Sequence, residues 1–120
     1  MAKRILVVDD EPDFLEILSV RLRAGGYEVE VAHNGEEALK KIQQFKPDLI
    51  LSDVIMPKMD GVDFFHALRQ DLQGRRIPVM IMTIKAQLEK AFRGLDVYDF
   101  IVKPINMDDF LSRVQACLNV

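Results

Sequence analysis

Charged and hydroxyl side chains follow four short apolar runs in this 120-residue chain, directly after each run ends. Asp9 and Asp10 follow the first run, and Asp53, Thr83 and Lys103 follow three later ones. In folds built on parallel strands, ligands bind at the carboxyl ends of the strands. If these runs are neighbouring strands, residues far apart in the sequence converge on one edge of one sheet.

Three carboxylates in one crevice need a counter-charge, because each disfavours the ionised form of the others. Oxygen ligands without cysteine or clustered histidine suit Mg²⁺. Lys103 and Thr83 then remain to hold a phosphoryl group, the lysine as a point charge and the threonine as a neutral donor. A central carboxylate beside the metal is a candidate nucleophile toward phosphorus, which gives an aspartyl-phosphate. Phosphoryl transfer needs mainly in-line positioning and charge neutralisation, and this set supplies both.

Each of these residues also has an ordinary structural interpretation. Asp9 and Asp10 could cap the following helix, Thr83 could cap another, and Lys103–Pro104 could be a solvated turn. The joint pattern favours a site, because all of them lie at the same end of the predicted strands. No charged residue interrupts three of these strands, Ile5–Val8, Leu49–Leu51 and Val79–Met82.

Apolar runs alternate with helical patterns along the whole chain, and the runs are continuous, as in strands buried on both faces. The alternation predicts an α/β fold, with one parallel sheet covered by helices on both faces in a single domain over residues 1–120. The strands are expected at Ile5–Val8, Tyr27–Val31, Leu49–Leu51, Ile77–Met82 and Phe100–Val102. The five helices are expected from Pro12 to the Gly25–Gly26 stop, from the Asn34 cap with its Glu37 capping-box partner to before Pro47, from Val62 to Leu72, from Ala86 to Gly94, and from the Asn106 cap to Leu118.

Composition excludes several classes of protein. Lys and Arg number 16 against 19 Asp and Glu, and a net charge of −3 argues against direct nucleic-acid binding. The single Cys117 excludes an internal disulfide and a multi-cysteine metal site. No apolar run approaches the roughly 18 residues of a membrane span, and Ile5–Val8 is too short for a signal peptide. We therefore expect a cytoplasmic protein without membrane insertion.

Four segments of the chain resemble the motifs of the receiver domain of bacterial two-component response regulators. The resemblance runs from about Arg4 to Leu118, and four motifs in this order are highly specific. It implies a flavodoxin-like doubly wound fold with five strands in the order 2-1-3-4-5 and five helices. The segments are Val7–Glu11, Leu51–Gly61, Met82–Thr83 and Phe100–Pro104.

The resemblance implies a chemical role for each acidic residue. Asp53 is the phosphoacceptor. Asp10 and Asp53 bind Mg²⁺ directly, together with the main-chain carbonyl of Ile55, and Asp9 helps through water. The implied partners are a sensor histidine kinase or phosphotransfer protein, and a downstream effector or a fused output domain that these 120 residues do not include. The chain is expected to be no enzyme beyond promoting its own phosphorylation and dephosphorylation.

The resemblance also implies a switch. Lys103 pairs with the phosphoryl group, Thr83 moves to hydrogen-bond it, and Phe100 turns inward as the aromatic switch residue. The Lys103–Pro104 bond is expected to be cis, as in the family. Phosphorylation then biases a two-state equilibrium that is read out over the fourth helix, fifth strand and fifth helix.

The sequence departs from the family pattern at two positions. Ile84 follows Thr83, where the family usually has a small residue, and either narrows the path to the site or packs into the core beside Phe100. Asp96 replaces the usual glycine before the fifth strand. Thr83 and Lys103 are only 20 positions apart, which predicts a shortened fourth helix.

Three other functions stay open at this point. A Mg²⁺-dependent phosphatase of the haloacid-dehalogenase type also uses an Asp nucleophile, but carries it after the first strand as Asp-x-Asp, whereas Asp9 and Asp10 are adjacent. A phosphorylation-independent interaction module is expected to have lost Asp53, Lys103 or a metal-binding acid. A flavodoxin needs a phosphate-cradling first loop, and this loop is acidic.

Overall fold

The computed structural model describes residues 2–53, 61–71, 74, 76–84, 90, 92 and 96–118. Its five strands form one parallel sheet in the order β2-β1-β3-β4-β5, which confirms the predicted topology. The strands are β1 (Arg4–Val8), β2 (Glu28–Ala32), β3 (Leu49–Asp53), β4 (Val79–Thr83) and β5 (Asp99–Val102).

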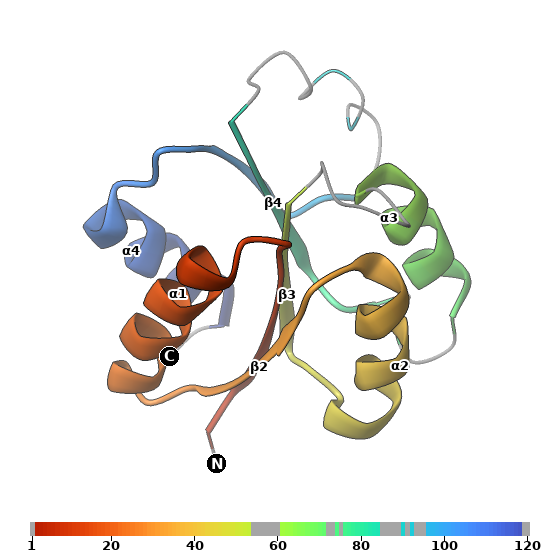
Figure 1. Ribbon diagram of the computed structural model, residues 1–120, viewed down its shortest axis with the longest axis horizontal. Coiled ribbons are helices and arrows are strands. Elements are labelled where there is room, and N and C mark those ends of the chain that lie inside the picture. The colour runs from red at the N-terminus through yellow and green to blue at the C-terminus, as the bar shows by residue number, and fades with distance from the viewer. Residues whose placement is uncertain are drawn as a thin grey trace.

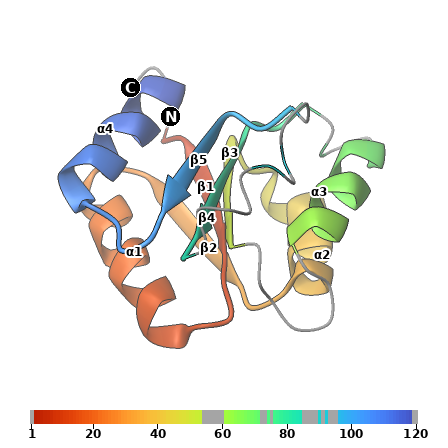
Figure 2. The same ribbon diagram turned by 90° about the horizontal axis from the view of Figure 1, so that it is seen from above.

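Helices cover both faces of this sheet. In Figures 1 and 2, α1 and α4 lie against one face, and α2 and α3 lie against the other. The described helices are α1 (Pro12–Ala24), α2 (Gly35–Phe45), α3 (Gly61–Gln70) and α4 (Met107–Leu118). The helix expected from Ala86 to Gly94 falls largely outside the described residues, so four of the five expected helices are described. None of these four is both long and apolar enough to cross a membrane.

The apolar strands serve two cores. Successive side chains of a strand point to opposite faces. Ile5 and Val7 therefore pack with α1 and α4, while Leu6 and Val8 pack with α2 and α3. All four side chains are completely buried. A sheet covered on both faces explains why the strands read as continuous apolar runs rather than alternating ones.

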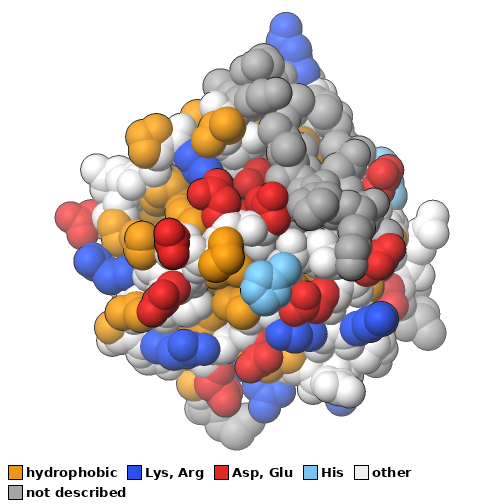
Figure 3. Space-filling model, in the orientation of Figure 1, with side chains coloured by type: hydrophobic (Ala, Val, Ile, Leu, Met, Phe, Trp, Pro, Cys, Tyr) orange, Lys and Arg blue, Asp and Glu red, His pale blue; other side chains and the backbone are white. Residues whose placement is uncertain are grey.

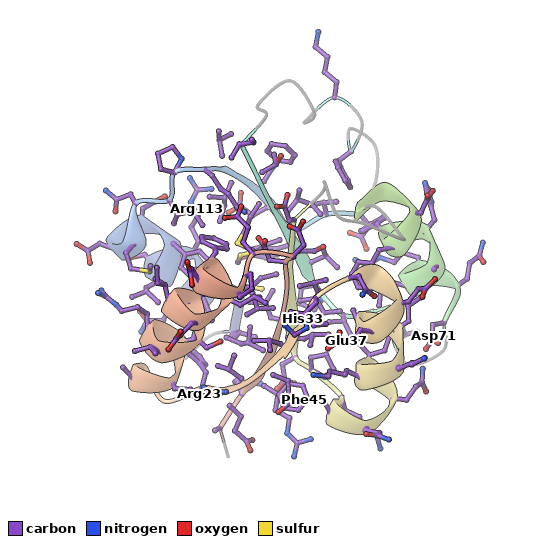
Figure 4. The ribbon with its side chains drawn as sticks, viewed as in Figure 1. Arg23, His33, Glu37, Phe45, Asp71 and Arg113 are labelled. Atoms are coloured by element: carbon purple, nitrogen blue, oxygen red, sulfur yellow. The ribbon has the colours of Figure 1, made fainter. Side chains whose placement is uncertain are left out.

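Side-chain caps fix where two helices begin. Asn34 Oδ1 accepts a hydrogen bond from Glu37 N at 2.9 Å, as predicted for α2. The reciprocal bond reaches one residue further back than in a standard capping box, because Glu37 Oε2 accepts from His33 N at 3.3 Å (Figure 4). Asn106 Oδ1 accepts from Asp109 N at 3.0 Å, which confirms the predicted cap of α4.

The start of α1 uses no such cap. The residue before the helix is Glu11, whose side chain makes no capping hydrogen bond, and Pro12 occupies the first helical turn. Asp9 Oδ1 instead accepts from Glu11 N at 3.0 Å, within the loop that precedes the helix. The interpretation of Asp9 and Asp10 as simple helix caps is therefore wrong, and both carboxylates are left for the site described below.

Candidate phosphoryl-acceptor site

Strand register brings the predicted site residues to one edge of the sheet. Asp53 is the last residue of β3 and pairs with Met82 of β4. Thr83, the next residue of β4, is therefore close to Asp53. Lys103 follows β5, and its main-chain N–H donates to Thr83 O at 2.7 Å. Asp9 follows β1, the other neighbour of β3. The convergence expected from the sequence is confirmed for all four strand ends.

Three carboxylates form a cluster at this edge. One oxygen from each of Asp9, Asp10 and Asp53 lies within 4.8 Å of the others. Asp9 and Asp53 are buried, whereas Asp10 is exposed. In Figure 3, acidic side chains gather near the centre of the visible face, with a basic side chain beside them. Carboxylate oxygens at this spacing fit a hard divalent cation that retains several waters.

Lys103 reaches into this cluster from β5. Its Nζ lies 2.8 Å from Asp9 Oδ2 and 3.1 Å from Asp53 Oδ2, and its side chain is only 8% exposed. Burial alone lowers the pKa of Lys103, but hydrogen bonds and charge from Asp9 and Asp53 outweigh burial, and the net pKa is raised. The ammonium therefore stays charged at neutral pH and offsets part of the repulsion between the carboxylates.

A cavity opens above Asp53. It has a volume of about 190 Å³ and is lined by Asp10, Glu11, Asp53, Ile84 and Lys103. Ile84 lies at its rim with 67% of its surface exposed. The alternative that Ile84 packs into the core beside Phe100 is therefore wrong. Ile84 is therefore an exposed apolar side chain beside the opening above Asp53.

The two predicted switch residues lie on neighbouring strands. Thr83 is completely buried at the end of β4. Phe100 of β5 is partly buried, and its ring centroid lies 6.2 Å from that of Phe92, which in turn contacts Phe65 edge-on. Ile55, the predicted main-chain metal ligand, lies outside the described residues.

The Lys103–Pro104 peptide bond is cis, as the resemblance implies.

One site residue escaped the sequence analysis. The ring of Phe14 in α1 lies over Lys103 Nζ, 4.1 Å from the ring centroid. In the sequence, Phe14 is simply the first member of the apolar helical pattern after Pro12. Its distance of four residues from Asp10 was the available signal, because the first turn of a helix that follows a site strand lies beside the site.

The family comparison excludes two of the three open alternatives. A family model described as "Response regulator receiver domain" matches residues 5–115. This chain belongs to that family. It is a receiver domain, a phosphorylation-activated signalling module rather than a classical enzyme, and the phosphatase and flavodoxin alternatives are wrong.

Curated relatives agree with this assignment. The alkaline phosphatase synthesis transcriptional regulatory protein PhoP of Bacillus subtilis is 41% identical over 120 residues, which cover 98% of this chain and 49% of that protein. The DNA-binding dual master transcriptional regulator RpaA of Synechocystis is 35% identical, over 96% of this chain and 48% of that protein. The receiver domain thus spans about half the length of these relatives.

Solved structures share the fold over nearly the whole chain. The chemotaxis protein CheY4 of Vibrio cholerae superposes with a TM-score of 0.90 at 33% identity, covering 98% of this chain and 99% of that one. The response regulator TrrA of Thermotoga maritima, in complex with Mg²⁺-BeF, gives a TM-score of 0.86 at 33% identity, covering 96% and 98%.

Proposed function

We propose that Asp53 accepts a phosphoryl group from a histidine kinase or phosphotransfer protein, with Mg²⁺ held by Asp10 and Asp53. The observation that carries this proposal is the position of Asp53. Its carboxylate belongs to the three-acid cluster, lies 3.1 Å from Lys103 Nζ, and lines the cavity of about 190 Å³. Of the three acids, it alone lies at the end of the central strand of the sheet.

The residues divide the work of the transfer. An Asp53 oxygen attacks phosphorus as the bond from phosphorus to the donor breaks, and the donor leaves with that bond's electron pair. Lys103 and Thr83 then donate hydrogen bonds to the phosphoryl oxygens. The metal, when bound, supplies positive charge against the charge on the transferring group. By the family resemblance, Asp9 would help to hold the metal through a water, and the main-chain carbonyl of Ile55, which lies outside the described residues, would be a further ligand.

We further propose that phosphorylation switches a protein-interaction surface through Thr83 and Phe100. The buried Thr83 lies next in the chain to the exposed Ile84, and Phe100 pairs with the β4 residue Ile81. A displacement of Thr83 toward a phosphoryl group changes the space beside Phe100. The partner that reads this surface is an effector protein or an output domain of the kind that the transcriptional regulators named above carry.

The deciding experiment maps the phosphate. The protein is incubated with Mg²⁺ and acetyl phosphate, and a hydroxylamine-sensitive phosphate is located by mass spectrometry. We expect it on Asp53 alone, and none in Asp53→Asn. Phosphate at full stoichiometry in that variant overturns the assignment, and no phosphate on the wild-type protein favours the phosphorylation-independent interaction module.

Two further variants separate metal binding from the switch. Asp10→Asn is expected to weaken Mg²⁺ binding and abolish phosphorylation, and an unchanged metal titration excludes this site. Lys103→Ala is expected to take some phosphate but to show little structural response, because the lysine is needed most once the phosphoryl group brings about two negative charges. A full wild-type spectral shift in phosphorylated Lys103→Ala contradicts this role.

A further inference from the structure

The ring of Phe14 lies directly over the ammonium that the proposed reaction needs. The distance of 4.1 Å from Lys103 Nζ to the ring centroid is well inside the roughly 6 Å range of a cation–π contact. Phe14 is only partly buried, at the margin of the core between the sheet, α1 and α4. The first turn of α1 therefore holds this ring at the site rather than deep in the core.

The hydrogen bonds of Lys103 explain what the ring contributes. An ammonium group has three N–H donors. Among the described residues, Nζ donates to two acceptors, Asp9 at 2.8 Å and Asp53 at 3.1 Å. The ring face of Phe14 lies on a further side of the ammonium. Because the Lys103 side chain is 8% exposed, this attraction acts with little competition from water.

We propose that Phe14 is a positioning residue for phosphoryl transfer, holding Lys103 Nζ beside Asp53 through its ring face. This inference rests on the proposed function. A ring face attracts a cation without fixing the direction of its N–H bonds. Lys103 can therefore turn one N–H from the Asp53 carboxylate to an arriving phosphoryl oxygen while its contact with the ring persists. A carboxylate in place of the ring would add a directional bond that resists this turn.

The chain offers a matched control for the removal of this ring. Arg4 lies over the ring of Phe45, 5.8 Å from its centroid. Phe45 is the last residue of α2, and Arg4 is the first residue of β1, so this pair lies at the end of the sheet opposite the site (Figure 4). Phe45→Leu thus removes a partly buried ring that contacts a cation, Arg4, and leaves Asp53 and Lys103 unchanged.

Phosphorylation kinetics test the positioning role. Wild type, Phe14→Leu, Phe14→Tyr and Phe45→Leu are compared at saturating Mg²⁺ over a range of acetyl phosphate concentrations. Loss of a cation–π contact in a site poor in water predicts a maximal rate about fivefold lower in Phe14→Leu, with the half-saturating donor concentration little changed. Phe14→Tyr retains a ring face and is expected within roughly twofold of wild type. Phe45→Leu is expected to match wild type.

A spectroscopic measurement keeps the test independent of phosphorylation. In the unphosphorylated protein, we expect the ring face of Phe14 to shift the NMR signals of the Lys103 ε-methylene protons upfield. This shift is expected to persist in Phe14→Tyr and Phe45→Leu and to vanish in Phe14→Leu. If the wild-type protein takes up no phosphate, the proposed function fails, while the spectrum still decides where the ring lies. A wild-type rate in Phe14→Leu, or Phe14→Tyr as slow as Phe14→Leu, overturns the positioning role.

Discussion

Ile84 is placed where a side chain could affect the rate of phosphorylation without contributing a catalytic group. It lines the cavity above Asp53 together with Lys103, and 67% of its surface is exposed. An isoleucine this exposed contributes little to the hydrophobic core, so its substitution should leave the free energy of unfolding nearly unaltered. Phosphoryl transfer needs the nucleophile in line with the leaving oxygen, and a side chain beside that line restricts the approach.

Ile84→Ala is therefore expected to speed two separate reactions, the phosphorylation of Asp53 and the hydrolysis of the aspartyl-phosphate. Phosphorylation by acetyl phosphate and hydrolytic loss of phosphate should each rise about tenfold, equivalent to ~1.4 kcal/mol of barrier. Ile17→Ala is the control, because Ile17 is also an exposed isoleucine but lies on α1 and does not line the cavity above Asp53. Unchanged rates in Ile84→Ala with a lower free energy of unfolding would show instead that Ile84 is a packing residue.

The start of α2 links helix formation to pH. Glu37 accepts hydrogen bonds from His33 N and the His33 ring, and it pairs with Lys41 at 3.4 Å. Burial alone raises the pKa of Glu37, but these bonds outweigh it and lower the net pKa from about 4.5. A carboxyl group whose pKa is lower in the folded than in the unfolded protein stabilises the folded state. This stabilisation is complete above the pKa of the unfolded protein, and it is lost as the pH falls through the pKa of the folded protein.

In Glu37→Gln, the free energy of unfolding is expected to fall less steeply than in wild type as the pH drops below about 4.5. The measurement is the free energy of urea unfolding at several pH values from neutral downward. Glu36→Gln removes the neighbouring exposed carboxylate of the same helix turn and serves as control. The same pH dependence in Glu37→Gln and wild type would contradict the linkage.

A single arginine joins α3 to the segments on either side of β4. The guanidinium of Arg69 donates to Gly74 O at 3.1 Å, Ile77 O at 2.7 Å and Asp96 O at 2.8 Å. It also lies over the ring of Phe65, 4.7 Å from the centroid. Asp96 takes part through its main-chain carbonyl, so the departure from glycine at this position does not disturb the contact.

Arg69→Met is expected to lower the free energy of unfolding by about 2–3 kcal/mol, because hydrogen bonds to charged groups contribute roughly 1.5–3 kcal/mol each and some of the carbonyls regain water. Arg69→Lys keeps the charge but not the planar fork, and should recover less than half of the loss. Arg113→Met removes the half-exposed ion pairs with Asp99 and Asp109 and should cost at most about 1 kcal/mol. Equal effects of the Arg69 and Arg113 substitutions would refute the special role of Arg69.

The elements that the sequence predicted well share a local signal. Caps such as Asn34 and Asn106 act within three residues, and apolar strands such as Ile5–Val8 follow from burial on both faces. The order of the strands is a property of the whole chain, and it followed from the family resemblance rather than from any local pattern.

Long side chains that reach from one helix or strand to another have no local sequence signal of this kind. Arg23 lies in the last turn of α1, and its Nη2 donates to Val29 O at 3.0 Å, on the edge strand β2 (Figure 4). The partners of Arg69 also lie far from it in the sequence, and whether its side chain reaches them depends on how the helices pack. The same limit applies to Ile84, whose two interpretations only the fold could separate.

At the scale of the whole molecule, the acidic edge of the sheet gathers like charges that a bound metal would offset. Asp9, Asp10 and Asp53 lie together in a chain whose net charge is already −3. Lys103 offsets only part of their repulsion, so the metal-free protein carries unfavourable charge at the end of its own sheet. A ligand that binds the folded state alone stabilises that state in proportion to its occupancy.

Mg²⁺ should therefore raise the stability of the whole domain. At 100 times the dissociation constant, the free energy of unfolding is expected to rise by about 2.7 kcal/mol. Asp10→Asn should gain far less from the metal, and without metal it should be more stable than wild type, because one repelling carboxylate is gone. Thermal unfolding of both proteins, with and without MgCl₂, measures the two effects together.

Glu16→Gln separates local repulsion from net charge, because it removes one exposed carboxylate of α1 that lies outside the three-acid cluster. It is expected to keep the full Mg²⁺ gain and the wild-type stability in metal-free buffer. If Glu16→Gln stabilises the metal-free protein as much as Asp10→Asn does, the destabilisation comes from the net charge of the protein rather than from repulsion within the three-acid cluster. If Asp10→Asn keeps the full Mg²⁺ gain, the metal binds somewhere other than the carboxyl ends of β1 and β3.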